Sequence, residues 1–178
     1  MLTNIALIVF LLIALVLAYA ASRPDDFRLE RSLTIRATPE KIFALISDFH
    51  QWSQWSPWEK LDQDLKRSYS GNASGVGAAY DWEGAKAGVG RMQIIQSDSP
   101  VLVKIKLDFL KPMKAHNTAE FALQLEGELT RVTWAMYGRS PYLAKVMGVF
   151  FSIDKMVGKD FEAGLQMMKA VAEKPAAD

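Results

Sequence analysis

The longest uninterrupted run of apolar residues lies at the N-terminus. From Ile5 to Ala21 every position is apolar or is Tyr19. As a helix this run would measure roughly 26 Å, close to the hydrocarbon thickness of a bilayer. Such a helix has no polar face for water, which disfavours a buried core helix in a soluble domain. We therefore predict a transmembrane anchor over residues 3–22 and a polar linker over residues 23–27.

A cleaved signal peptide is the alternative for this run, because Ala18-Tyr19-Ala20 resembles a small-x-small cleavage pattern. No Lys or Arg precedes the run, however, and it is longer than the apolar core of a usual signal peptide. These two features favour the anchor. Arg23, Arg28, Arg31 and Arg36 follow the run, so the positive-inside rule favours a single-pass membrane protein with its domain in the cytoplasm.

After the linker the pattern alternates between apolar and polar residues, which is typical of a strand with one buried face. Thr38-Pro39 predicts the start of a helix, and Ser47 or Asp48 can cap a second, shorter one. About six further alternating stretches follow between residues 65 and 136, separated by turn residues. From Tyr142 onward apolar residues recur at three- and four-residue steps, which predicts one final helix of about thirty residues.

This order of elements predicts an α+β domain over residues 28–172. An antiparallel sheet with one solvated face must bury the other face, and the final helix is the one predicted element long enough to cover it. We therefore expect a curved antiparallel sheet wrapped around a long C-terminal helix, with two short helices after the first strand. The last residues, 173–178, form a predicted disordered tail.

The composition excludes several classes of function. The chain has 178 residues, with 21 Lys and Arg against 20 Asp and Glu and a net charge of +1, so it lacks the basic field of a nucleic-acid-binding protein. The absence of cysteine excludes thiolate catalysis and thiolate metal sites. His50 and His116 do not share metal-ligand spacing, and the paired glycines at 75/77 and 88/90 lack the context of a phosphate loop. We expect no nucleic acid partner, no metal and no cofactor.

Several short strings resemble one superfamily. They include Arg31-Ser32-Leu33, Trp55-Ser56-Pro57-Trp58-Glu59, Gly88-Val89-Gly90-Arg91-Met92 and the segment from Val157 to Leu165, and with others they cover residues 28–171. In this order they resemble membrane-tethered bacterial members of the SRPBCC superfamily, which includes START, Bet v 1 and polyketide cyclase/dehydrase-like proteins. The resemblance implies the helix-grip fold. It leaves the function open, because this superfamily holds lipid carriers, hormone receptors and cyclases.

In a helix-grip domain the sheet and the long helix leave a cavity between them, so inward-facing residues double as its walls. Aromatic and Met side chains suit a flexible apolar guest, although the same residues could instead pack a dry core. The candidate ligand-binding residues are Arg31, Trp55, Trp58, Tyr80, Trp82, Met92, Ile105, Leu107, Asn117, Phe121, Trp134, Met136, Met147, Phe150 and Phe151.

Two polar residues and three glycines stand out within the predicted elements. Arg31 falls on an inward face, where it could hold an acidic head group or form a structural ion pair. Asp48, Glu59 and Asp154 are candidate partners for that pair. Asn117 could hydrogen-bond a guest or be satisfied by backbone. The glycines cost up to about 1 kcal/mol each in a helix, which indicates a close approach or a bend; they are Gly148, Gly158 and Gly164.

Three functional hypotheses follow. The first is membrane-anchored binding of a hydrophobic or lipid-like small molecule. The second is a pocket enzyme of cyclase or hydratase type, in which Arg31, His50, Asp48 or Tyr80 would handle protons. The third is a protein-interaction module with a collapsed pocket and exposed tryptophans at 52–58. The first is favoured over the second because the sequence presents no evident acid/base pair, so no catalytic residue is assigned, and no protein partner is specified.

Overall fold

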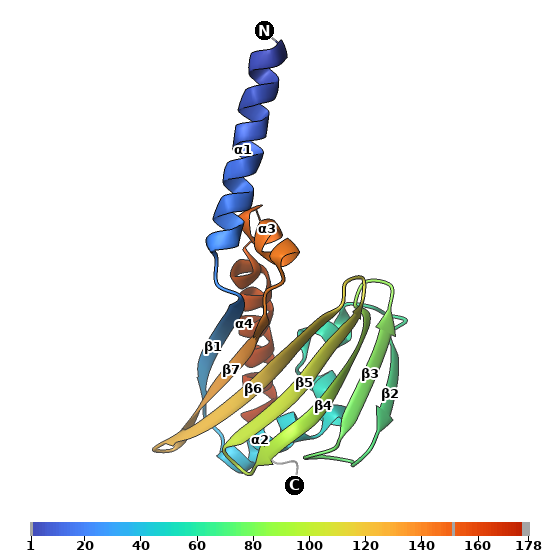
Figure 1. Cartoon of the computed structure of the whole chain (residues 1–178). Helices are drawn as coiled ribbons and strands as arrows, with labels where there is room; N and C mark the ends of the chain where they lie inside the picture. The colour runs from blue at the N-terminus through green and yellow to red at the C-terminus, as the bar shows by residue number, and fades with distance from the viewer. Residues whose placement is uncertain (1, 151, 176–178) are drawn as a thin grey trace.

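Helix α1 (Leu2–Ser22) projects from the rest of the molecule, as Figure 1 shows. The computed structural model describes residues 2–150 and 152–175, so Phe151 and the last residues of the predicted tail, 176–178, lie outside the description. Within the described residues, α1 is the one helix long and apolar enough to cross a membrane, over Thr3–Ser22. Its length and composition fit both an anchor and an N-terminal signal sequence.

Seven antiparallel strands form one curved sheet in the order β1-β7-β6-β5-β4-β3-β2 (Figure 1). From β2 to β7, each strand pairs with the next strand in the chain. Strand β1 pairs with β7, so β1 and β2 are the two edge strands of the sheet. The strands are β1 (Asp26–Ile35), β2 (Lys66–Ser70), β3 (Ala79–Gly84), β4 (Gly88–Asp98), β5 (Leu102–Lys111), β6 (Ala115–Glu126) and β7 (Leu129–Arg139). The helices after α1 are α2 (Pro39–Ser47), α3 (Tyr142–Phe150) and α4 (Ile153–Ala172), with 3-10 helices η1 (Phe49–Gln54) and η2 (Pro57–Lys60).

The segment between β1 and β2 is held by side chains that bond to backbone. The Thr38 hydroxyl accepts from the Lys41 N–H and begins α2, and the Asp48 carboxylate accepts from the His50 N–H at 2.9 Å and begins η1. The indole N–H of Trp52 donates to the Ile46 carbonyl, and that of Trp55 donates to the Leu45 carbonyl. These bonds fold η1 back onto α2 and fix both tryptophans in the interior.

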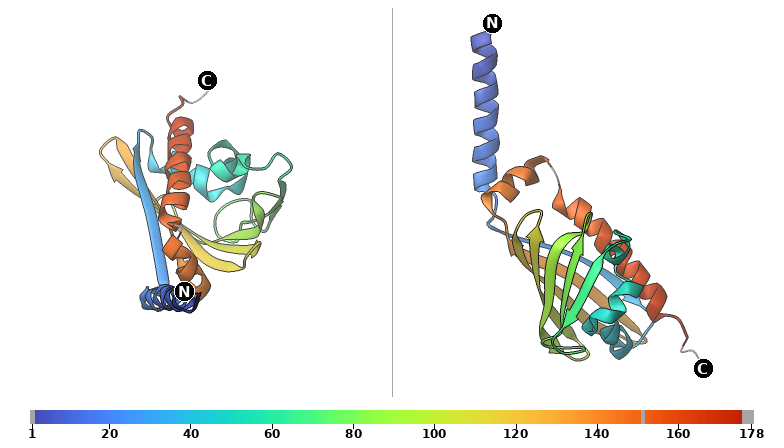
Figure 2. Two further views of the ribbon diagram at one scale, coloured as in Figure 1. Left: turned by 90° about the horizontal axis from the view of Figure 1, so that it is seen from above. Right: turned by 90° about the vertical axis from the view of Figure 1, so that its right-hand side faces the viewer.

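The concave face of the sheet holds the α4 helix and the η1 and η2 turns (Figure 2). Phe161, Leu165 and Met168 of α4 are buried there against the sheet. A seven-stranded antiparallel sheet gripping a C-terminal helix of 20 residues confirms the predicted helix-grip α+β class.

The prediction of one uninterrupted final helix is wrong. The chain stops helix α3 at Phe150 and starts α4 at Ile153. Ser152 has extended backbone and its side chain accepts from the Lys155 N–H at 3.2 Å, while Asp154 lies in the first turn of α4. A capping hydroxyl and an early carboxylate both favour a helix start. Consequently α4 alone fills the grip, and α3 lies beside the last turns of α1 (Figure 2).

Candidate ligand-binding site

A largely apolar cavity of about 270 Å³ lies between the concave face of the sheet, η2 and α4. This volume falls just below the ~300–1,000 Å³ typical of sites for drug-sized ligands, so it suits a small or slender apolar molecule. The wall is formed by Trp52, Ser56, Trp58, Glu59, Leu65, Tyr80, Trp82, Ala87, Met92, Leu107, Phe109, Ala119, Trp134, Met136, Val157 and Phe161.

Trp82 forms the wall at the end of the cavity near the β3–β4 turn. Its indole N–H donates to the Ala87 carbonyl at 3.1 Å, and its ring meets Phe109 edge to face at 5.8 Å between centroids. The ring lies across Gly90, where a Cβ atom would overlap it. Gly90 therefore lets a broad indole lie flat against β4.

Aromatic rings pack tightly around Trp134 at mid-sheet. Trp134 is stacked between Phe161, at 4.1 Å between centroids, and Phe121, at 4.8 Å. Trp55 and Trp58 each meet it nearly perpendicularly at 5.5 Å. Its indole N–H is the one buried side-chain polar atom within the described part of the chain that has no hydrogen-bond partner. Such a group is stabilised when an acceptor reaches it.

A buried carboxylate interrupts the apolar wall. The Glu59 side chain is only 6% exposed. Its Oε1 accepts from the Tyr80 hydroxyl at 2.6 Å, and its Oε2 accepts from Arg67 Nε at 2.6 Å. Arg67 also donates to the Glu59 and Leu65 carbonyls. These two charge-assisted bonds, one of them the ion pair with Arg67, offset the cost of burying this charge.

Tyr80 stays protonated and donates toward Glu59. Burial, together with its bond to the carboxylate, raises the pKa of Tyr80 well above its ordinary value. Both residues lie in the cavity wall, so a phenol and a carboxylate meet at one point of an otherwise apolar surface. This polar corner, defined as Glu59, Tyr80 and Arg67, can orient a guest or take part in proton transfer.

Sequence reasoning missed most of this corner. It considered Glu59 only as a partner for Arg31 and did not consider Arg67. Glu59 follows Trp58 on the 3-10 helix η2, which Pro57 begins, and no strand or helix periodicity indicates that it turns inward. A charged residue beside inward-facing tryptophans was the one available signal.

The predicted ligand-binding residues separate into groups. Trp55, Ile105 and Phe121 are fully buried core residues that do not line the cavity. Asn117 lies at a second, open hollow beside Phe27 and Gly138, at the start of β6. Seven predicted residues lie in the cavity wall: Trp58, Tyr80, Trp82, Met92, Leu107, Trp134 and Met136.

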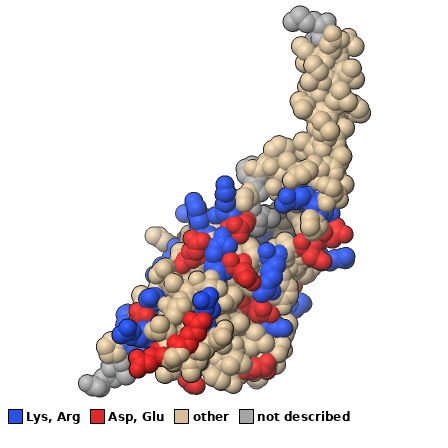
Figure 3. Space-filling view, turned by 90° about the vertical axis from the view of Figure 1, so that its left-hand side faces the viewer, with Lys and Arg blue, Asp and Glu red and all other residues tan. Residues whose placement is uncertain are grey.

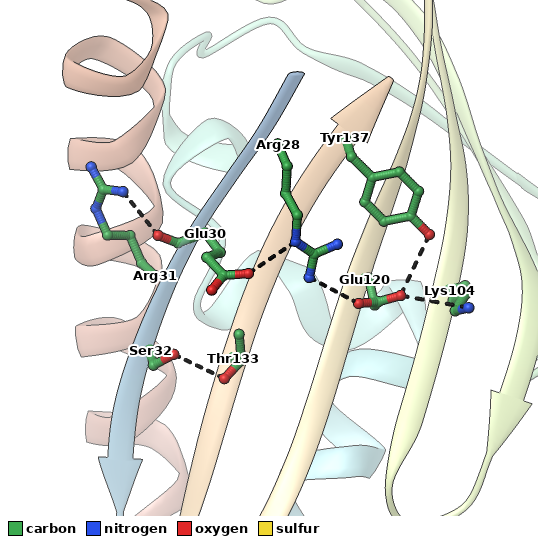
Figure 4. A network of polar contacts seen from close by, with 8 residues as sticks. All are labelled: Arg28, Glu30, Arg31, Ser32, Lys104, Glu120, Thr133 and Tyr137. Carbon is green, nitrogen blue, oxygen red and sulfur yellow. Dashed lines mark hydrogen bonds and ion pairs between the residues drawn. The ribbon is translucent and has the colours of Figure 1, made fainter. Parts of the chain in front are cut away.

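Arg31 does not reach the cavity. Its guanidinium contacts Asp154 through Nη1 at 3.0 Å and Nη2 at 3.1 Å, and Glu162 through Nε at 2.7 Å. Hydrogen bonds to these carboxylates raise the pKa of Arg31 above its ordinary value. Figure 4 shows Arg31 directed toward α4, whereas Arg28, Glu30 and Glu120 lie on the opposite face of the sheet. Of its three candidate partners, Asp154 is the one that binds it.

The helix break displaces two of the last three candidates. Met147 and Phe150 are exposed on α3 rather than directed into the grip, and Phe151 lies outside the described residues. His50 does not line the cavity: its Nδ1 lies 2.9 Å from Asp48 Oδ1, and its ring stacks on Tyr69. Trp52 and Trp55 are buried, which removes the exposed surface that the interaction-module hypothesis placed there.

No group of three or more His, Asp or Glu side chains is placed to hold a metal ion within residues 2–150 and 152–175.

Comparison with known proteins identifies the architecture. Residues 26–173 match the family model described as polyketide cyclase / dehydrase and lipid transport. No curated protein matches the chain. Protein CV1439 from Chromobacterium violaceum has a similar structure, with a TM-score of 0.59 at 12% identity, covering 85% of this chain and 100% of its own.

Two further solved structures share the fold. Ginseng major latex-like protein 151 from Panax ginseng has a TM-score of 0.60 at 13% identity, covering 85% of this chain and 100% of its own. The di-domain ARO/CYC BexL from the BE-7585A biosynthetic pathway has a TM-score of 0.63 at 12% identity, covering 89% of this chain and 53% of its own. At these identities the likeness is one of fold.

Proposed function

The chain belongs to the polyketide cyclase / dehydrase and lipid transport family, and from this premise we propose that it binds a hydrophobic small molecule in its cavity while α1 anchors it to a membrane. The observation that carries the proposal is the cavity of about 270 Å³ lined mainly by tryptophan, phenylalanine, methionine and other apolar side chains. A collapsed core would leave no such space.

The wall supports a guest with an apolar body and one polar group. Arg67 already neutralises the Glu59 carboxylate, so the polar corner has no uncompensated charge for an ionic head group. A hydroxyl is the matching group, since the Tyr80 oxygen in the cavity wall can accept a hydrogen bond from it. An anchor would hold the cavity close to a bilayer, where molecules of this class partition.

A matched pair of substitutions on β6 tests this binding. Ala119 lies in the cavity wall, whereas Ala122 lies on the opposite face of the same strand. Full-length protein would be isolated in polymer-bounded native nanodiscs, without detergent that could displace a guest, and bound small molecules identified by extraction and mass spectrometry. We expect a guest in the wild type and in Ala122→Phe, and its loss in Ala119→Phe. Equal occupancy in both variants, or no guest in the wild type, contradicts the proposal.

The second candidate function is a pocket enzyme, and the Glu59–Tyr80 contact of 2.6 Å in the cavity wall favours it. Among the residues first considered for proton handling, Tyr80 is the one in the wall. A dehydratase or cyclase would lose turnover on Glu59→Gln and accumulate its substrate. Extracts of wild type and Glu59→Gln would then hold different compounds, differing by one water for a dehydration. The same compound in both would support binding without reaction.

The membrane side is a separate part of the proposal. Arg23 directly follows α1 and no basic side chain precedes it, which supports a cytoplasmic domain. Because the chain has no cysteine, Leu125→Cys supplies a single label site. A membrane-impermeant maleimide should modify this site only after spheroplasts are lysed. Labelling in intact spheroplasts would reverse the orientation.

A further inference from the structure

Helix α3 exposes a continuous apolar stripe. Leu143, Met147 and Phe150 recur at four- and three-residue steps on one face and are 63%, 46% and 66% exposed. Three large apolar side chains on nine residues are unfavourable in water, and none of them reaches the core. Among the described residues, the stripe is an uncovered apolar surface next to α1.

Contacts between α3 and α1 fix the position of α3 along the axis of α1. The Tyr142 hydroxyl donates to the Leu17 carbonyl at 3.0 Å. Leu17 lies five residues inside the end of α1 at Ser22, which is roughly 7 Å along the helix axis. The right-hand view of Figure 2 shows α3 rising from the base of α1, alongside its last turns. The stripe therefore lies at the depth of those turns.

An ion pair between a covered lysine side chain and an exposed aspartate holds the other side of α3 to the linker. Lys145 is 8% exposed, and its Nζ contacts the Asp25 carboxylate at 2.5 Å and the Arg23 carbonyl at 3.0 Å. With its one charged side chain turned inward, α3 presents no charge on its outer face. Figure 3 shows the uncharged surface of α1 continuing onto α3, with Lys, Arg, Asp and Glu side chains beginning below it.

The surroundings match the boundary between lipid head groups and acyl chains. Tyr19 and Tyr142 lie at this level, and the Arg23 guanidinium contacts the Tyr19 hydroxyl, as in the aromatic and basic belts of membrane proteins. The β5–β6 turn lies at the same end of the domain (Figure 1) and exposes Met113 between Lys111 and Lys114. An exposed apolar side chain flanked by lysines can insert into a bilayer while the lysines bind anionic lipid head groups.

We propose that α3 is an interfacial helix whose Leu143, Met147 and Phe150 stripe inserts into the bilayer that holds α1, with the β5–β6 turn touching the same surface. This inference rests on the membrane anchoring proposed above. The 21 residues of α1 span about 31 Å, equal to a hydrocarbon core of about 30 Å. If α1 crosses it, a helix tied to Leu17 lies within the 5–10 Å depth that interfacial helices occupy.

Insertion of α3 would also determine which end of the cavity faces the bilayer. Ala87, Phe109 and Val157 line the end of the cavity nearest the β3–β4 turn, the β5–β6 turn and the start of α4. Figure 1 places these turns at the α3 end of the sheet. Insertion of α3 would hold that end toward the lipid and leave the β6–β7 turn pointing away.

Single-cysteine variants of the cysteine-free full chain test the insertion. Met147→Cys would carry an NBD fluorophore in vesicles of phosphatidylcholine and phosphatidylglycerol, with nitroxide-labelled lipids as quenchers. Leu125→Cys, 60% exposed at the β6–β7 turn, is the matched control. We expect a blue-shifted emission and about threefold stronger quenching at 147 than at 125, because an inserted stripe lies 5–10 Å deep.

A third label on α1 separates the two proposals. Phe10→Cys lies in the middle of α1, so its quenching by a deep nitroxide reports anchoring alone. Absence of quenching at 10 overturns both the anchor and the insertion of α3. Quenching at 10 with a water-exposed label at 147 overturns only the insertion. A label at 147 that is shielded from water but unquenched by lipid also overturns it, and indicates a protein partner or a second copy of the chain.

Discussion

Helices α3 and α4 follow each other along the chain with the same three- and four-residue apolar spacing, yet they meet opposite environments. In α4, Phe161 and Leu165 are 2% and 1% exposed under the sheet, whereas Leu143 and Phe150 of α3 are uncovered. Each helix is tied to the β1 region by its own ion pair, Arg31–Asp154 for α4 and Lys145–Asp25 for α3. Apolar periodicity in the sequence therefore indicates an apolar stripe on a helix but does not indicate what covers that stripe.

The largest expected effect comes from truncating one phenylalanine in each helix. Phe161→Ala removes a ring that stacks on Trp134, so the free energy of unfolding should fall by about 3–5 kcal/mol. Phe150→Ala removes an exposed ring and should change it by less than about 0.5 kcal/mol. Urea unfolding of the full chain in a mild detergent, followed by tryptophan fluorescence, measures both. Equal losses would contradict the contrast between the helices.

Glycine substitutions should give an effect of intermediate size. A Cβ atom at Gly158 would overlap the Arg31 guanidinium, whereas one at Gly148 meets no atom within 4 Å. Gly158→Ala should therefore lower the free energy of unfolding by about 1–3 kcal/mol. Gly148→Ala should change it by less than about 0.5 kcal/mol, because no atom crowds this position and α3 contributes no buried side chain to the core.

Coupling to Arg31 checks the cause of the glycine effect. Gly158→Ala should lose much less stability in an Arg31→Ala background than in the wild type, since the overlapping group is then absent. An unchanged loss in that double variant would mean that the crowding comes from elsewhere.

The smallest expected effect is a pH dependence that separates the two ion pairs. The hydrogen bond from Arg31 lowers the pKa of Asp154 below its ordinary value of 3.8. A carboxyl with a lowered folded-state pKa stabilises the fold above the unfolded value and loses that contribution as the pH falls through the folded one. The urea midpoint of Asp154→Asn should therefore lie below that of the wild type at neutral pH and converge with it below about pH 3.8.

The matching substitution on α3 is Asp25→Asn. The bond from Lys145 likewise lowers the pKa of Asp25, but this pair holds a helix that contributes no buried side chain to the core. The urea midpoint should stay close to that of the wild type across the same pH range, while a label at residue 147 reports a change in its environment. A midpoint shift as large as that of Asp154→Asn would show that α3 is part of the folded core.

Prediction from sequence succeeded for features that a few neighbouring residues control. The caps at Thr38 and Asp48, the strand alternation and the order of elements follow from local patterns, and the structure confirms them. The inward side of a strand was also readable, since Trp82, Met92 and Leu107 face the concave side. How deeply a side chain is buried could not be predicted from the sequence. Trp58 lines the cavity, whereas Trp55, three residues earlier, is buried in the core.

Local patterns in the sequence were enough to predict the apolar N-terminal helix, the alternating strands and the amphipathic C-terminal segment, and through them the helix-grip class. Long-range contacts fixed three features: α4 starts after Ser152, Arg31 binds Asp154 and Glu162, and the cavity-wall residue Glu59 binds Tyr80 and Arg67. Periodicity is a property of adjacent turns and strands. Burial, ion pairing and empty space depend on residues that are distant in the chain and meet only when the sheet curves around α4.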